Sequence, residues 1–200
     1  KAYAQRHQDD RIYFPGHWTF TNSDGESQRL DVSIRTRGNF RREFCTFPPL
    51  QLNFKKSQVK GTLFKKQDKL KLVAPCHTGP ASQQNVLTEY LAYRIYEILT
   101  DRSFGTRLMR LSYIDSDSKS IARTSLVFVI EDDDAVAKRL DLDKLRVGYN
   151  ELSMLDLPTT ALLDLFQLMI GNNDYSVLKG PDGKYCCHNV EMLVDEKATD

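Results

Sequence analysis

Three short segments in the first half of the chain alternate apolar and polar residues, and this pattern limits the fold more than any other feature of the sequence. The segments are Leu30–Ile34, Leu50–Phe54 and Lys69–Val73. Successive side chains of a β-strand point to opposite faces of its sheet, so such alternation is typical of a half-buried strand. The three segments therefore predict strands of one antiparallel sheet.

A long amphipathic helix is predicted after these strands. Pro75, Gly79 and Pro80 interrupt the strand pattern, and between residues 82 and 100 apolar residues stand at positions 87, 91, 95, 98 and 99. This spacing follows one face of an α-helix. Ser82 is the expected N-cap, because its hydroxyl can accept a hydrogen bond from an amide of the first turn.

The second half of the chain predicts two more strands and two more helices. Residues 107–113 and 125–131 are predicted strands, and the acidic run that begins residues 132–140 is typical of a helix start. Residues 158–170 predict a second long helix with a proline in its first turn. This helix is apolar on nearly every side, so we expect it to be buried.

The last part of the chain predicts a hairpin. The sequence Pro181-Asp182-Gly183 is a turn signal between two extended pieces, the second of which covers residues 184–194. We therefore expect a hairpin over residues 174–194. Strands followed by a helix, more strands, a buried helix and a hairpin form an α+β order, which is the predicted fold class.

Charge is distributed unevenly along the chain. From Arg29 to Lys71 there are 12 Lys and Arg against 3 acids, and from Glu131 to Asp200 there are 15 acids against 7 bases. This distribution would suit a site in which basic groups of the first half bind phosphates and carboxylates of the second half bind a metal. Two solvated surfaces of opposite sign explain the same pattern. The net charge of +1 lacks the basic excess of a nucleic-acid binder, and no apolar run is long enough for a transmembrane segment.

The chain contains four cysteines, which allow two disulfides. Cys45 and Cys76 flank strands of the same half and are the expected pair if the protein is exported; buried free thiols are the alternative in a cytosolic protein. Cys186 and Cys187 precede His188, but adjacent cysteines of a strand point to opposite faces. That arrangement argues against a zinc site.

Four motifs carry a resemblance to a known family. They are Arg35-Thr-Arg-Gly-Asn39, then Lys69-Leu-Lys-Leu-Val73 with a helix containing Leu87-Thr-Glu-Tyr-Leu-Ala-Tyr-Arg94, then Ile170-Gly-Asn-Asn-Asp-Tyr-Ser176, and finally His188-Asn189. In order and spacing they resemble the CotH-kinase-like family, the spore-coat H type of atypical bacterial protein kinase.

The resemblance implies an atypical protein-kinase-like fold in two lobes. Residues 1–131 are expected to form the small lobe, an antiparallel sheet with helix 82–100. Residues 132–200 are expected to form part of a helical catalytic lobe, with buried helix 158–170 and hairpin 174–194. The implied reaction transfers the γ-phosphate of ATP to a hydroxyl of a protein substrate with Mg²⁺. An exported or cell-surface bacterial location is the corresponding expectation.

The candidate catalytic residue is Asp174. On a loop after the second long helix, its carboxylate could accept the proton of a substrate hydroxyl. Asn189 is the candidate Mg²⁺ ligand, because the predicted hairpin could return its amide oxygen beside Asp174. His188 would then point to the opposite face. A second interpretation stays open, in which Asn173 and Asp174 only form the turn that ends the helix.

Lys71 is the candidate nucleotide-binding lysine, with Lys69 on the same face as its substitute. Kinases pair a strand lysine with a helix glutamate to hold the nucleotide phosphates, and Glu89 on the predicted helix is the expected partner. Exposed strand lysines and a solvated glutamate are an equally open interpretation.

Arg35, Arg37 and Gly38 are the remaining candidate phosphate-binding residues. The arginines can offer guanidinium forks to a phosphate, and the glycine lets the backbone come close to it. Arg41 and Arg42 could add to this site or bind an acidic substrate.

The sequence departs from the family in two places. It has no glycine-rich nucleotide motif, although the family tolerates that absence. It also lacks the Asp-Phe-Asp-like metal motif that follows the His-Asn strand in the family, since Asp195, Glu196 and Asp200 do not match it. We therefore expect these 200 residues alone to lack the full metal site. The alternative function is a non-catalytic binding or surface module of an exported bacterial protein on the same scaffold.

Overall fold

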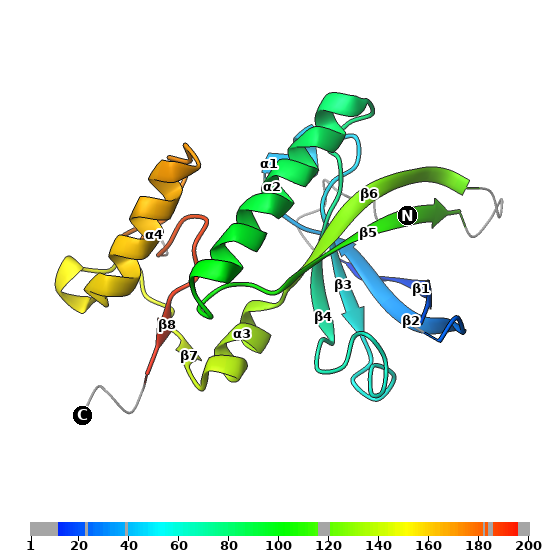
Figure 1. Cartoon of the computed structure of the whole chain (residues 1–200), viewed down its shortest axis with the longest axis horizontal. Helices are drawn as coiled ribbons and strands as arrows, with labels where there is room; N and C mark the ends of the chain where they lie inside the picture. Colours follow the sequence, from blue (N-terminus) through cyan, green and yellow to red (C-terminus); the bar gives the residue numbers. More distant parts are fainter. Residues whose placement is uncertain are drawn as a thin grey trace. The chain divides into compact units, whose positions relative to one another are not determined.

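The computed structural model describes residues 12–22, 24–38, 40–115, 121–181, 183 and 186–195. Asn39, Asp182, Glu196 and Asp200, which the sequence motifs include, lie outside the described residues. The chain divides into two compact units, Lys1–Asp132 and Asp133–Asp200, and this division falls one residue after the predicted boundary. The structure is a mixed α/β protein with a curved antiparallel sheet and few helices, in agreement with the predicted α+β class (Figure 1).

The first unit is built on a six-stranded antiparallel sheet with the order β1-β2-β3-β4-β6-β5. Its strands are β1 Phe14–Thr21, β2 Ser27–Thr36, β3 Leu50–Phe54, β4 Lys69–Val73, β5 Thr106–Ile114 and β6 Ile121–Glu131. Five of these strands confirm predicted segments. β1 was not predicted, because Pro15 and Gly16 conceal the alternation of its first residues.

One face of this sheet forms the larger apolar core. The buried residues Leu52, Leu70 and Leu72 lie in its centre. The connection between β3 and β4 covers them, since it contributes Phe64, whose ring lies edge-on to that of Trp18 at 6.1 Å between centroids. The alternation of apolar and polar residues in the sequence therefore correctly predicts the buried face of β2, β3 and β4.

Helix α2, Pro80–Leu99, packs on the other face of the sheet (Figure 1). Tyr90 and Tyr93 lie beside the fully buried Phe128 of β6, with ring centroids 5.7 and 5.8 Å away. The helix was predicted, but its start was wrong by two residues. It begins at Pro80, whose fixed φ suits a first turn. Ser82 is not the N-cap; its Oγ accepts a hydrogen bond from the backbone N–H of His77 at 3.0 Å.

The short helix α1, Phe40–Phe44, is tied to the end of β4 by a disulfide between Cys45 and Cys76. The Cα atoms of this pair are 4.7 Å apart, which confirms the predicted pairing. Arg123 of β6 reinforces the connection. Its guanidinium stacks on the ring of Phe47 at 3.9 Å and donates to the carbonyl of His77 at 3.2 Å.

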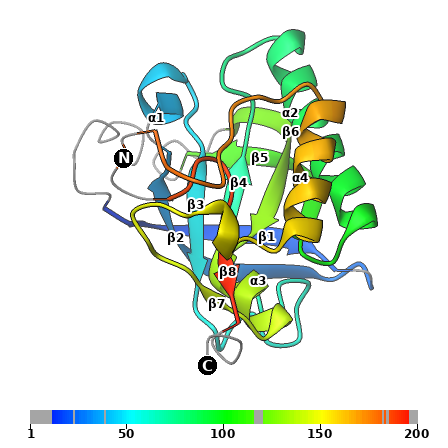
Figure 2. The same cartoon turned by 90° about the vertical axis from the view of Figure 1, so that its left-hand side faces the viewer.

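The second unit contains little regular structure. Its elements are α3 Asp133–Leu140, β7 Asp143–Lys144, the 3-10 helix η1 Leu152–Met154, α4 Leu157–Met169 and β8 Leu193–Val194. β7 and β8 form a two-stranded antiparallel sheet next to α3 (Figure 2). Lys144 joins the strand to the helix, because its Nζ forms an ion pair with Asp133 at 2.9 Å and another with Asp134.

Two predictions for the second unit are wrong. Helix α4 is not buried on all sides: only Phe166 and Gln167 are buried, whereas Leu165 and Leu168 are 66% and 77% exposed. The segment 184–194 is not one strand, because between Cys186 and Val194 the described residues show an isolated bridge and the two residues of β8. The turn before it does form, with the N–H of Gly183 donating to Gly180 at 3.1 Å.

Among the described residues, no helix is both long and apolar enough to cross a membrane.

Candidate functional site

Asp174 lies on the loop that follows α4, as the sequence predicts. Gly171 follows the C-cap of this helix and has a φ of +68°, in the left-handed region that glycine adopts without a Cβ clash. The chain then turns away from the helix. The side chain of Asp174 is 74% exposed, so its carboxylate is open to an approaching molecule.

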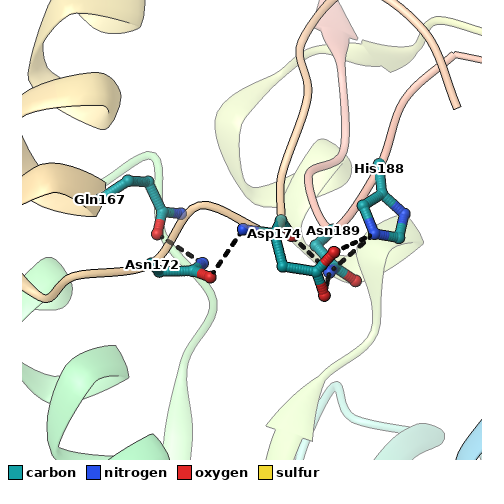
Figure 3. A network of polar contacts seen from close by, with 5 residues as sticks. All are labelled: Gln167, Asn172, Asp174, His188 and Asn189. Atoms are coloured by element: carbon teal, nitrogen blue, oxygen red, sulfur yellow. Dashed lines mark hydrogen bonds and ion pairs between the residues drawn. The ribbon is translucent and has the colours of Figure 1, made fainter. Parts of the chain in front are cut away.

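Four polar groups of Asp174 are nevertheless fixed by hydrogen bonds (Figure 3). Its N–H donates to Asn172 Oδ1 at 3.1 Å, and its carbonyl accepts from Asn189 Nδ2 at 2.6 Å. Oδ2 accepts from the same Asn189 Nδ2 at 3.0 Å, and Oδ1 lies 2.7 Å from His188 Nε2. An exposed side chain normally samples several rotamers, so this network holds the carboxylate in one orientation.

The side chains of Asp174 and Asn189 are therefore in contact, which confirms that the chain returns Asn189 to Asp174, but the sequence predicted the amide oxygen at this contact and the structure places the amide nitrogen there. The structure presents Asn189 through its amide nitrogen, so the amide oxygen is directed away from the carboxylate. One carboxylate and one amide match the oxygen donors that Mg²⁺ takes in proteins, because this ion usually completes its shell with water and phosphate oxygens. No group of three His, Cys, Asp or Glu that could hold a metal occurs in the part of the chain that the structure describes.

The prediction that His188 points to the opposite face is wrong. Its Nε2 contacts Asp174 and lies 3.3 Å from Asn189 Nδ2. The prediction assumed an extended strand with alternating side chains. The backbone of Asn189 instead has a φ of +52°, which is outside the extended region. Alternation does not hold across such a residue, and both side chains turn to the same carboxylate.

Cys186 and Cys187 also face one side, in contrast to the alternation that was expected of them. Their Sγ atoms lie 3.5 and 3.3 Å from the carbonyl oxygen of Val177, and Asn150 Nδ2 is 3.2 and 3.6 Å from them. The two cysteines are joined in a disulfide. They are therefore not available as thiolate ligands of zinc.

Tyr175 is a second ionisable group on the same loop. Its hydroxyl donates to Asp164 Oδ1 at 2.6 Å, and this hydrogen bond, together with burial, raises the pKa of Tyr175 to about 12. The phenol therefore stays protonated at neutral pH. Asp174 is the better candidate for a proton acceptor on this loop.

In the first unit, the candidate cations lie on the face of the sheet that α2 covers. Arg35, Gln51, Lys71 and Ile130 are direct partners across β2, β3, β4 and β6, so their side chains share one face. Ile130 packs with α2 in the smaller core. The row thus runs from an apolar end under the helix to a basic end at β2.

The structure shows an ion pair between Glu89 and Arg41 of α1. Glu89 Oε2 accepts from Nη1 and Nη2 of Arg41 at 3.2 and 3.3 Å. Nζ of Lys71 lies 5.0 Å from the centroid of the Phe104 ring. A guanidinium can bind a carboxylate through two nitrogens, whereas the ammonium of a lysine is a point charge, which favours the arginine. Lys69, two residues before Lys71, shares its face of the strand.

Arg35, Arg37 and Gly38 lie where the sequence predicts, at the end of β2. The Arg35 guanidinium lies 5.0 Å from the ring centroid of Tyr13, and its Nε is buried without a hydrogen-bond partner among the described residues. Gly38 has a φ of +78°, which a residue with a Cβ adopts with strain.

The pKa of Tyr93 of α2 depends on the charged residues of this region. Burial, followed by the carboxylate of Glu89, raises the pKa of Tyr93 to about 12, while Arg37 and Arg41 act in the opposite direction. Arg37, Arg41, Glu89 and Tyr93 are therefore close enough to interact electrostatically. We refer to Arg35, Arg37, Arg41 and Lys71 below as the basic cluster of the first unit.

Two residues near Asp174 were missed by the sequence-based prediction. Gln167 is buried and bonded to Asn172, and Asn172 was named only as a member of the motif of residues 170–176. The available signal was a polar residue at position 167 within an otherwise apolar stretch of the helix.

Comparison of the chain with protein-family models, with curated proteins and with solved structures finds no significant match. A function must therefore be supported by the chemistry of the two groups of residues described above.

Proposed function

We propose that this chain is an ATP-dependent phosphotransferase of the atypical, CotH-kinase-like type that moves the γ-phosphate of ATP to a protein hydroxyl with Mg²⁺. The observation that carries the proposal is the state of Asp174, whose exposed carboxylate is held by two hydrogen bonds and whose backbone is held by two more. Phosphoryl transfer needs little covalent help from a protein and depends on positioned charges.

In this reaction Asp174 accepts the proton of the substrate hydroxyl. The hydroxyl oxygen attacks the γ-phosphorus, the bond from that phosphorus to the bridging oxygen breaks, and ADP leaves. His188 and Asn189 each hold one carboxylate oxygen, so they keep the remaining lone pairs directed to solvent. A general base positioned in this way contributes roughly 10²–10⁴-fold to a rate.

Asn189 is the residue that would hold Mg²⁺, through the amide oxygen that is directed away from the Asp174 carboxylate. When bound, the ion supplies positive charge that neutralises the β- and γ-phosphates. Asn189 also accounts for two of the hydrogen bonds on Asp174, so it organises the loop as well.

The basic cluster of the first unit supports the nucleotide part of the proposal. Arg35 and Lys71 lie in one row across the sheet, and each is directly opposite Gln51 of the strand between them. Cations of this kind attract the charged phosphates of ATP.

Lys71→Ala is expected to weaken the binding of ATP. Loss of a charge-assisted hydrogen bond to a phosphate costs about 1.5–3 kcal/mol, which corresponds to a rise in Kd of about 10–100-fold. The measurement is a calorimetric or fluorescence titration of the full-length protein with ATP and Mg²⁺, and Lys69→Ala is titrated in parallel because it is the substitute candidate.

Lys56→Ala is the matched control for this experiment. It removes the same charge from the same unit, at a side chain that is 83% exposed and forms a long ion pair of 3.9 Å with Asp68. We expect its Kd for ATP to equal that of the unchanged protein. Unchanged affinity in both Lys71→Ala and Lys69→Ala would contradict the assignment of the nucleotide phosphates to this strand.

A second candidate function, a non-catalytic binding or surface module, is favoured by one observation in the second unit. Several large apolar side chains of η1 and α4 are exposed, which often marks a surface that binds another protein. They are Leu152, Met154, Leu157, Leu165, Leu168 and Met169. Absence of both ATP binding and phosphate transfer in the full-length protein would favour this function over the kinase.

A further inference from the structure

Gln167 is a buried polar residue in an apolar helix. It belongs to the last turns of α4, and its side chain and backbone together are 8% exposed. An amide that loses its contact with water without gaining a hydrogen bond destabilises a protein by about 1–3 kcal/mol. The burial of Gln167 therefore has to be offset by bonds within the protein.

Those bonds go to Asn172, just beyond the end of the helix. The side-chain Oε1 of Gln167 accepts from Asn172 Nδ2 at 2.8 Å (Figure 3). The backbone carbonyl of Gln167 also accepts from the backbone N–H of Asn172 at 2.9 Å. Two hydrogen bonds to one residue fix both the backbone and the side chain of Asn172 against the helix.

The bond from Gln167 also decides how the amide of Asn172 is turned. Because Nδ2 of Asn172 donates to Gln167, its Oδ1 is left to accept from the N–H of Asp174 at 3.1 Å. If the amide were turned over, its oxygen would face the oxygen of Gln167 and its NH₂ group would face the N–H of Asp174. Both contacts would be repulsive, so the present orientation is favoured.

We infer that Gln167 is a positioning residue for Asp174 and acts through Asn172. This inference rests on the proposed function, because it gives Asp174 its role as the proton acceptor. His188 and Asn189 hold the carboxylate end of Asp174, whereas Gln167 and Asn172 hold its backbone N–H. A carboxylate needs both constraints to stay at one distance from a substrate hydroxyl.

Gln167→Met tests the inference, because methionine has a similar length but no oxygen to accept from Asn172. In the full-length protein we expect kcat for phosphate transfer to fall about 10–100-fold, since small displacements of a reacting group have effects of that size. KM for ATP is expected to stay unchanged, because the basic cluster is untouched. Gln167→Glu keeps an oxygen acceptor and is expected to recover most of the lost kcat.

Phe166→Leu is the control, since it changes packing in the same buried turn and leaves the side chain of Gln167 in place. If Phe166→Leu and Gln167→Met lower kcat equally, or if Gln167→Glu is as impaired as Gln167→Met, Gln167 acts only through stability and the inference is overturned.

Amide hydrogen exchange at Asp174 gives a readout that does not depend on activity. Gln167→Met is expected to speed exchange of this N–H at least tenfold, while Gln167→Glu and Phe166→Leu leave it within about threefold of the unchanged protein. Unchanged exchange in Gln167→Met overturns the inference even if kcat falls. If the exchange rates follow this pattern but the protein transfers no phosphate, the link from Gln167 to the Asp174 loop is supported. In that case it is the proposed function that is overturned.

Discussion

Replacement of Asp174 by Asn is expected to lower kcat for phosphate transfer by roughly 10²–10⁴-fold, which is the usual contribution of a general base. Asparagine has nearly the same shape but cannot take up the proton of a substrate hydroxyl. The side chain is 74% exposed and contributes little to a core, so we expect the thermal midpoint of unfolding to change by only a few degrees.

The measurement is transfer of labelled γ-phosphate from ATP by the full-length protein, with melting followed on the same samples. Asp141→Asn is the matched control, because it makes the same substitution at an exposed residue of the same unit. Its φ of +56° is also one that asparagine tolerates. The control is expected to keep its kcat. Full activity in Asp174→Asn, or a loss that follows a drop in stability, would show that Asp174 is a structural turn residue.

The strands and the first long helix could be predicted from the sequence because their burial is one-sided. β3 buries Leu52 and Phe54 under one face, and α2 places Val86 and Tyr93 against the other, so the periods of two and of about 3.6 residues are visible. β1 was missed because Pro15 and Gly16 do not show which face they occupy. The periodicity of apolar residues along the sequence predicts those helices and strands that bury a single face.

Helix α4 shows the reverse case. Its sequence is apolar on nearly every side, and the pattern alone indicated burial on all sides, yet Leu165 and Leu168 are exposed. Burial of an apolar side chain is favourable, but the sequence of the helix does not show which part of the protein covers that side chain. Within α4 the informative residue was the polar one, Gln167.

The environment of Asp174 could be predicted in part. A turn signal before the return segment placed Asn189 near Asp174, and this depends only on chain reversal. The inward position of His188 depends on the φ of +52° at Asn189, which a strand pattern does not reveal. The pair of Glu89 and Arg41 joins residues 48 positions apart, and the rule of opposite charges does not by itself point to Arg41. Such choices are made by tertiary packing.

Removal of the Cys45–Cys76 disulfide is expected to lower the free energy of unfolding of the first unit by about 3–4 kcal/mol. The bond joins residues separated by 31 positions, and a cross-link over a loop of that length reduces the entropy of the unfolded chain by about this amount. The N–H of Phe47 also donates to the carbonyl of Cys76 at 3.0 Å, so a hydrogen bond joins the same two segments as the disulfide. Arg123 holds the same two segments together.

The variant is Cys45→Ala combined with Cys76→Ala, and the probe is the fluorescence of Trp18. This is the single tryptophan of the chain, and it is buried in the core of the first unit. Its signal in a urea titration therefore follows the unit that contains the disulfide, and it separates that transition from unfolding of the second unit.

The second disulfide provides the control. Cys186 and Cys187 are adjacent, so their bond closes almost no loop, and the same entropy relation gives it only about 1 kcal/mol. Replacing both by Ala is expected to leave the Trp18 transition within that margin. Reducing agent should lower the stability of the unchanged protein to that of the Cys45→Ala, Cys76→Ala variant and have little further effect on the variant. A variant as stable as the unchanged protein would mean that Cys45 and Cys76 are not joined in solution, and that non-covalent contacts such as those of Arg123 and Phe47 hold α1 to the end of β4.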